Sequence, residues 1–135
     1  MKTLIVEDDF TSRLLLQKIL IPYGECHIAV NGREAIHAYR LARQQGRAYD
    51  LICLDIMMPE MDGQEVLKEI RRMENSEDVP AGQGVKVIMT TALKDKENVF
   101  SAFNEQCDGY LVKPIDKTKL LKHLVEFGFI EPDQA

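Results

Sequence analysis

Short apolar runs alternate with longer amphipathic segments five times along the chain. In the longer segments, apolar residues recur three and four positions apart, which is the spacing of one helix face. The pattern predicts strands at residues 4–6, 26–30, 51–54, 87–89 and 110–112. It predicts a first helix over residues 11–21 and four more helices with apolar seams at 35–42, 66–73, 99–107 and 120–125.

This alternation of strand and helix favours an α/β fold with a parallel sheet, because parallel strands need crossover connections and helices supply them. Residues 51–54 are apolar without alternation, which is typical of a central strand covered on both faces. Residues 26–30 alternate between apolar and polar, as expected near a sheet edge. The polar stretch 74–84, with one proline and two glycines, is interpreted as a surface loop.

Composition and charge narrow the possible functions. The chain has 135 residues, 45% of them hydrophobic and 29% charged, which is typical of one globular domain. Its net charge of −5 and the lack of a basic run argue against direct nucleic-acid binding. No apolar run approaches the roughly 20 residues of a membrane span, and Glu7 makes the start acidic too early for a secretory signal. Three widely spaced cysteines and scattered histidines predict free thiols in the cytoplasm rather than disulfides or a zinc site.

Polar groups follow the predicted strands at their carboxyl ends, which meet at one edge of a parallel sheet, where ligands bind in such folds. Adjacent carboxylates repel one another, and a divalent cation that prefers oxygen ligands relieves that repulsion. We therefore expect Mg²⁺, with Mn²⁺ as a second candidate. The groups in question are Glu7, Asp8 and Asp9 after the first strand, Asp55 after the third, Thr91 after the fourth and Lys113 after the fifth.

The same groups suit phosphoryl transfer. A metal-held carboxylate can attack phosphorus and form an aspartyl phosphate, and the rest of that reaction is positioning and charge neutralisation. Lys113 can neutralise one of the developing charges, and the Thr91 hydroxyl can donate to a phosphoryl oxygen. Taken singly, each residue has a plainer explanation: the acids can cap the first helix, Thr91 can be structural, and Lys113 with Pro114 can form a turn. Their joint position at one sheet edge favours the site.

Four segments closely resemble the receiver domains of two-component response regulators: Ile5–Asp9, Leu54–Gly63, Met89–Ala92 and Gly109–Pro114. They occur in the family's order and spacing, from about Lys2 to Phe127. The resemblance implies a flavodoxin-like three-layer sandwich with five helices and strand order 2-1-3-4-5. It also implies a receiver domain over residues 1–128 and a tail over 129–135 without an output domain.

The resemblance further implies the chemistry at the sheet edge. Asp55 would be the phosphoacceptor, charged by a sensor histidine kinase or a histidine phosphotransfer protein. The domain would be a signalling module that catalyses only its own phosphorylation and dephosphorylation. Its implied metal ligands are Glu7, Asp8, Asp55 and the backbone carbonyl of Met57.

Other positions of the family pattern would contact or respond to the phosphoryl group. Lys113, Thr91 and Ala92 would contact it, and the bond to Pro114 would be cis. Thr91 and Tyr110 would form a switch pair that remodels the face of the fourth helix, fifth strand and fifth helix. Two positions that tune the phosphoryl lifetime are apolar here, Met57 and Leu93, so slow self-hydrolysis is expected.

Two functions from other classes fit the sequence less well. A phosphatase that also uses an aspartyl phosphate needs a second aspartate two places after the first, where this chain has Met57. A flavin-binding protein of similar fold needs a Ser-, Thr- and Gly-rich loop where this chain has acids at 7–9. The output remains open between docking on an unknown downstream target, relaying phosphate onward, and serving as part of a longer protein.

Overall fold

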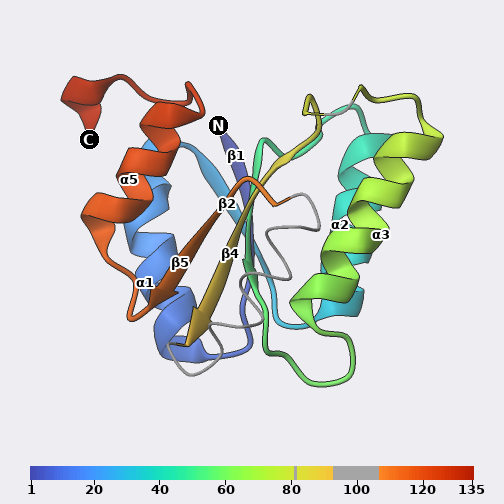
Figure 1. Ribbon diagram of the computed structural model, residues 1–135, viewed down its shortest axis with the longest axis horizontal. Helices are drawn as coiled ribbons and strands as arrows, with labels where there is room; N and C mark the ends of the chain where they lie inside the picture. Colours follow the sequence, from blue (N-terminus) through green and yellow to red (C-terminus); the bar gives the residue numbers. More distant parts are fainter. Residues whose placement is uncertain (81, 93–106) are drawn as a thin grey trace.

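The computed structural model of the protein describes residues 1–80, 82–92 and 107–135 (Figure 1). Its sheet has five parallel strands in the order β2-β1-β3-β4-β5. This order and direction confirm the expected α/β fold. The strands are β1 (Lys2–Val6), β2 (Glu25–Ala29), β3 (Leu51–Asp55), β4 (Lys86–Ala92) and β5 (Gly109–Lys113).

Helices cover both faces of the sheet, so the described part of the chain forms three layers (Figure 1). One face carries α1 (Phe10–Leu20) and α5 (Lys117–Glu126), and the other carries α2 (Gly32–Gln44) and α3 (Gly63–Ser76) (Figure 1). Two short 3₁₀ segments, Ile21–Tyr23 and Pro132–Gln134, complete the described elements. The helix expected around 99–107 falls almost wholly outside the described residues, so the described part of the chain has four α-helices.

Burial follows the predicted strand positions. All five residues of the central β3 are buried, whereas the edge strand β2 is largely exposed or half-buried. Each of the described α-helices begins at a side chain that accepts a hydrogen bond from a backbone N–H in its first turn, which satisfies one of the free donors there. These capping residues are Asp9, Asn31, Asp62 and Asp116.

Three details differ from the sequence prediction. Leu15, placed in the apolar seam of the first helix, is 37% exposed, while Leu16 is buried. The fourth strand extends through Thr90 and Thr91, which are both buried. The surface loop expected from residue 74 begins later, because α3 continues to Ser76 and buries Glu74.

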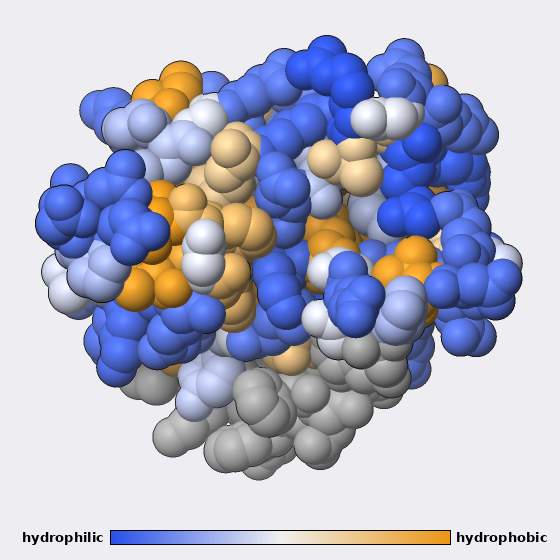
Figure 2. Space-filling model, turned by 90° about the horizontal axis from the view of Figure 1, so that it is seen from above, coloured by the Kyte–Doolittle hydropathy of each residue, from blue (hydrophilic) through white to orange (hydrophobic). Residues whose placement is uncertain are grey.

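The C-terminal segment expected as a tail packs against the domain. Gly128 adopts a left-handed backbone (φ 82°), and the Phe129 N–H donates to the Leu124 carbonyl to close α5. Ile130 is buried in the core between α1, α5 and the sheet, and the Tyr23 hydroxyl donates to the Gln134 carbonyl at 2.8 Å. Figure 2 shows this end of the molecule, where apolar side chains gather on the side of α5 and the C-terminal segment.

Candidate functional site

The carboxyl ends of β1, β3 and β5 bring an acidic cluster and a lysine together. Asp55 is the last residue of β3, Lys113 is the last residue of β5, and Glu7 and Asp8 directly follow β1. The carboxylates of Glu7, Asp8 and Asp55 each offer one oxygen, and these oxygens lie within 4.8 Å of one another. Glu7 and Asp55 are buried and Asp8 is exposed, so the cluster is open on one side.

Lys113 reaches into this cluster. Its Nζ lies 2.8 Å from Oε2 and 3.0 Å from Oε1 of Glu7, and 3.5 Å from Oδ2 of Asp55. Burial works to lower the pKa of Lys113, but the hydrogen bond to Glu7 and the two negative charges outweigh it and raise the pKa. The ammonium is therefore charged and available to an incoming anion.

Asp55 is in the opposite situation. Burial, followed by the negative charge of Glu7, raises its pKa to about 7, and these effects outweigh the opposing charge of Lys113 and the N–H of Met57 at 3.2 Å from Oδ1. Three carboxylates with one lysine leave a surplus of negative charge. This donor set, all oxygen with an open side at Asp8, fits Mg²⁺.

The start of α1 holds the first acidic turn in place. Asp9, the third acid, caps this helix by accepting from the Ser12 N–H at 2.9 Å and lies outside the cluster. Arg13 in the first turn donates to the carbonyl of Glu7 at 3.2 Å. The sequence interpretation missed Arg13, because nothing in its spacing marks a contact to a carbonyl six residues earlier.

Gly63, the first residue of α3, packs directly against the backbone of Asp55. A Cβ at this position would lie 2.3 Å from the Asp55 carbonyl oxygen, so no larger residue fits without a shift. The Gly63 N–H donates to the Ile56 carbonyl at 2.8 Å. The close approach of α3 to the end of β3 therefore depends on glycine, which the sequence showed only as part of a motif.

Most of the remaining predicted residues lie on β4, on β5 or next to the ends of β3 and β5. Thr91 is buried and its hydroxyl donates to the Ala92 carbonyl at 3.2 Å, while Tyr110 is 43% exposed on β5. Ala92 pairs with Lys113 in the sheet. The Lys113–Pro114 peptide bond is cis, and the Met57 side chain is exposed. Leu93 lies outside the described residues, and the switch and lifetime roles of these positions stay predictions.

Comparison with known proteins places this geometry in a family. The response regulator receiver domain family matches residues 3–125. The chain is 32% identical over 128 residues to the hybrid signal transduction histidine kinase L of Dictyostelium discoideum, covering 94% of this chain and 7% of that protein. It is 34% identical over 121 residues to the probable transcriptional regulatory protein SilR of Salmonella typhimurium, covering 90% of this chain and 48% of that protein.

Solved structures agree with this assignment. The chemotaxis protein CheY4 of Vibrio cholerae has a TM-score of 0.71 at 30% identity, covering 93% of this chain and 97% of that chain. The receiver domain of the sensor histidine kinase PA1611 from Pseudomonas aeruginosa has a TM-score of 0.71 at 27% identity, covering 93% and 95%. That receiver was solved with a magnesium ion coordinated in its active-site cleft.

The fold and the acidic pocket define a signalling module of the two-component type, a class distinct from conventional enzymes. The chain belongs to the response regulator receiver domain family. This assignment sets aside the phosphatase and flavin-binding alternatives. The chain spans only part of the length of the curated relatives that it matches, for example 52% of a probable transcriptional regulator of Porphyra purpurea. Among the described residues, no helix has the length and apolar character needed to cross a membrane.

Proposed function

We propose that the protein accepts a phosphoryl group on Asp55 in a Mg²⁺-dependent reaction. The observation that carries this proposal is the cluster of Glu7, Asp8 and Asp55 within 4.8 Å, with the Lys113 ammonium 2.8 to 3.5 Å from two of them. The donor would be a phosphohistidine on a sensor histidine kinase or a histidine phosphotransfer protein, as is usual for the family. We propose that this exchange takes place in the cytoplasm, in keeping with the free cysteines.

The residues of the cluster would have two roles, metal binding and attack on phosphorus. Glu7, Asp8, Asp55 and the backbone carbonyl of Met57 would hold Mg²⁺, which supplies positive charge to the transferring phosphoryl oxygens. The receiver solved with magnesium supports Mg²⁺, and Mn²⁺ has no such support. A free oxygen of Asp55 would form the new bond to phosphorus while the bond to the donor's imidazole nitrogen breaks, and the imidazole would take up a proton.

Three further residues would bind the transferred group. The Lys113 ammonium would exchange part of its contact with Glu7 for a phosphoryl oxygen. The Thr91 hydroxyl, now on the Ala92 carbonyl, would rotate to donate to the phosphoryl group, and the Ala92 N–H would donate to another oxygen. The phosphoryl group would thus gain donors from β4 and β5 together.

The output would follow from the same contacts. Rotation of Thr91 would favour an inward position of Tyr110, whose ring is now 43% exposed, and so change the surface around β5 and α5 for a downstream partner. Met57 and Leu93 carry no group that could orient a water, so the phosphoryl group would be long-lived. A half-life of seconds for the purified phosphoprotein would contradict this.

Intact mass measurement after incubation with acetyl phosphate tests the proposal. The wild-type protein should gain one phosphoryl group with Mg²⁺ and none with EDTA, and Asp55→Asn should gain none. Asp9→Asn is the matched control, because Asp9 lies next to the cluster but caps α1, and an asparagine can still cap. Equal phosphorylation of Asp55→Asn, or phosphorylation that ignores the metal, would overturn the proposal.

A further inference from the structure

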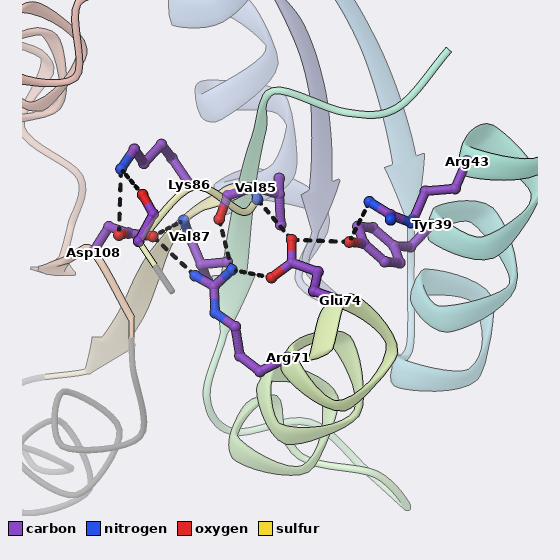
Figure 3. Close-up of polar contacts among 9 residues, drawn as sticks. Tyr39, Arg43, Arg71, Glu74, Val85, Lys86, Val87 and Asp108 are labelled. Atoms are coloured by element: carbon purple, nitrogen blue, oxygen red, sulfur yellow. Dashed lines mark hydrogen bonds and ion pairs between the residues drawn. The ribbon is translucent and has the colours of Figure 1, made fainter. Parts of the chain in front are cut away.

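A network of polar contacts joins α3, the start of β4 and the residue before β5 (Figure 3). It lies at the end of the sheet where the strands begin, opposite the acidic cluster. Glu74 accepts hydrogen bonds from the Val85 N–H at 2.7 Å and from the Tyr39 hydroxyl at 3.0 Å. Arg71, one turn earlier in α3, donates to Glu74 at 2.8 Å, to the Val85 carbonyl at 2.9 Å and to Asp108 at 3.0 Å.

Asp108 binds Val87 of β4 in both directions. Its N–H donates to the Val87 carbonyl at 2.8 Å, and its carboxylate accepts from the Val87 N–H at 2.8 Å. The N–H of Lys86 donates to the carbonyl of Asp50 on the β3 side, so the groups of Val87 point away from β3. The Asp108 side chain therefore replaces a strand partner just before the first sheet pair of β5, which joins Gly109 to Ile88.

The position of β5 matters for the site because β5 is an edge strand. It pairs with β4 alone, and its far end carries Lys113 opposite Ala92. A slip of one residue along β4 would turn Tyr110 and Lys113 to the other faces of the sheet. A contact that fixes the start of β5 therefore also fixes where the Lys113 ammonium lies.

We propose that Asp108, held by Arg71, is a positioning residue that sets the register of β5 on β4 and so places Lys113 beside Asp55. The inference rests on the proposed function, in which Lys113 contacts the phosphoryl group. The metal would be held from β1 and β3 and from the turn after β3. Loss of Asp108 should therefore slow phosphoryl transfer while leaving Mg²⁺ binding intact.

Two substitutions of Asp108 separate its hydrogen bond to the Val87 N–H from its ion pairs. Asp108→Ala removes all of these contacts, and Asp108→Asn keeps an oxygen for the Val87 N–H while removing the charge that pairs with Arg71 and, at 3.8 Å, with Lys86. The phosphorylation rate with acetyl phosphate at saturating Mg²⁺ is measured by intact mass, and the Mg²⁺ dissociation constant by calorimetry. Small misplacements of a catalytic group are costly, so we expect Asp108→Ala to be about tenfold slower and Asp108→Asn to be intermediate. Neither variant should bind Mg²⁺ more weakly than wild type, because moving the Lys113 charge away from Glu7 and Asp55 does not disfavour a cation.

Asp50→Ala is the matched control. The exposed carboxylate of Asp50 accepts from the Lys2 N–H at 2.7 Å at the same end of the sheet, but it serves β1 rather than β5. This variant also loses a carboxylate that binds a strand N–H, and it should keep the wild-type rate. Lys113→Met should behave like Asp108→Ala: its phosphorylation should be slower, and its Mg²⁺ binding should not be weaker.

Two results would overturn the inference: a wild-type rate for Asp108→Ala, or a fall in its Mg²⁺ affinity that matches the fall in rate. A wild-type protein that gains no phosphoryl group would instead refute the proposed function. In that case hydrogen exchange tests the inference directly, since the β5 amides should exchange faster in Asp108→Ala than in Asp50→Ala. Equal exchange in the two variants would reject the positioning role.

Discussion

The same pocket stabilises the charged form of Lys113 and destabilises the charged form of Asp55. Lys113 is stabilised in its charged form by two carboxylates, whereas burial and Glu7 disfavour the charged form of Asp55. In the metal-free protein, the ionised Asp55 carboxylate therefore lowers the stability of the folded state at neutral pH. Added positive charge would relieve that destabilisation, and the proposed Mg²⁺ would supply it.

The raised pKa of Asp55, about 7 against an ordinary 3.8, makes the stability of the metal-free protein depend on pH. Between those values the folded state binds more protons than the unfolded state, so this group makes stability fall as pH rises from about 4 to about 7. We expect Asp55→Asn to be more stable than wild type by about 2–4 kcal/mol at pH 8 in EDTA, with little difference at pH 4. Urea denaturation at both pH values measures it, and parallel pH profiles for the two proteins would contradict it.

Addition of Mg²⁺ should restore part of the stability that the ionised Asp55 carboxylate removes. At a Mg²⁺ concentration 100 times the dissociation constant, binding stabilises the folded state by about 2.7 kcal/mol. We expect the melting temperature of the wild-type protein to rise with Mg²⁺ and to return with EDTA. Asp8→Asn should lose most of the rise, because it removes one of the three carboxylates that would hold the ion. Thermal melts at matched ionic strength measure the effect, and an equal rise in Asp8→Asn would argue against the site.

The residues that gather at the carboxyl ends of the strands were the easiest to predict from the sequence. Asp55 and Lys113 each end an apolar strand, and a parallel sheet brings such ends together. The structural roles of Arg13 and Gly63 were missed because their partners are backbone atoms whose position only the fold defines. Every residue has a backbone carbonyl, so the sequence does not show which carbonyl accepts a side-chain hydrogen bond.

At the scale of elements, one buried carboxylate of α3 helps to hold the residue before β4. Glu74 accepts from Tyr39 and Val85 and pairs with Arg71. Glu74→Ala would leave the arginine charge and a backbone N–H without this partner, which costs about 2–4 kcal/mol of unfolding free energy. Glu74→Gln keeps an acceptor and should cost less.

Urea denaturation measures this loss, and Glu69→Ala provides its control. Glu69 forms an ion pair with Arg72 on the same helix, three residues apart and near the surface. Such pairs contribute about 0–1 kcal/mol. A Glu74→Ala variant no less stable than Glu69→Ala would show that the buried network contributes nothing.

The same region shows why element boundaries were harder to predict than elements. Strands with apolar runs and helices with a clear seam were found, because burial dictates those patterns. The end of α3 was placed too early, since Glu74 begins a polar stretch that is typical of a loop. Its burial depends on Arg71, Tyr39 and Val85, and such pairing through space has no local pattern.

At the scale of the molecule, the two ends of the sheet carry different kinds of contacts. The carboxyl ends of the strands hold the acidic cluster, and the opposite end holds the strand-start contacts and the folded C-terminal segment. The sequence predicted the first end because its residues carry reactive groups. The second end uses ordinary residues, and its contribution is stability and register.

The C-terminal segment allows a test that separates these roles. Removal of residues 129–135 would expose the site that Ile130 fills, remove the Phe129 N–H that closes α5, and remove the contact between Tyr23 and Gln134. Burial of an Ile side chain alone is worth about 1.5–3 kcal/mol, so the unfolding free energy should fall by at least that range. Ile130→Ala should show much of the loss, and Asp133→Ala, at an exposed position, almost none. Because the segment lies away from Asp55, phosphorylation of the folded variants below their melting temperature should match wild type, and a slower rate in Ile130→Ala would show that the two ends are coupled.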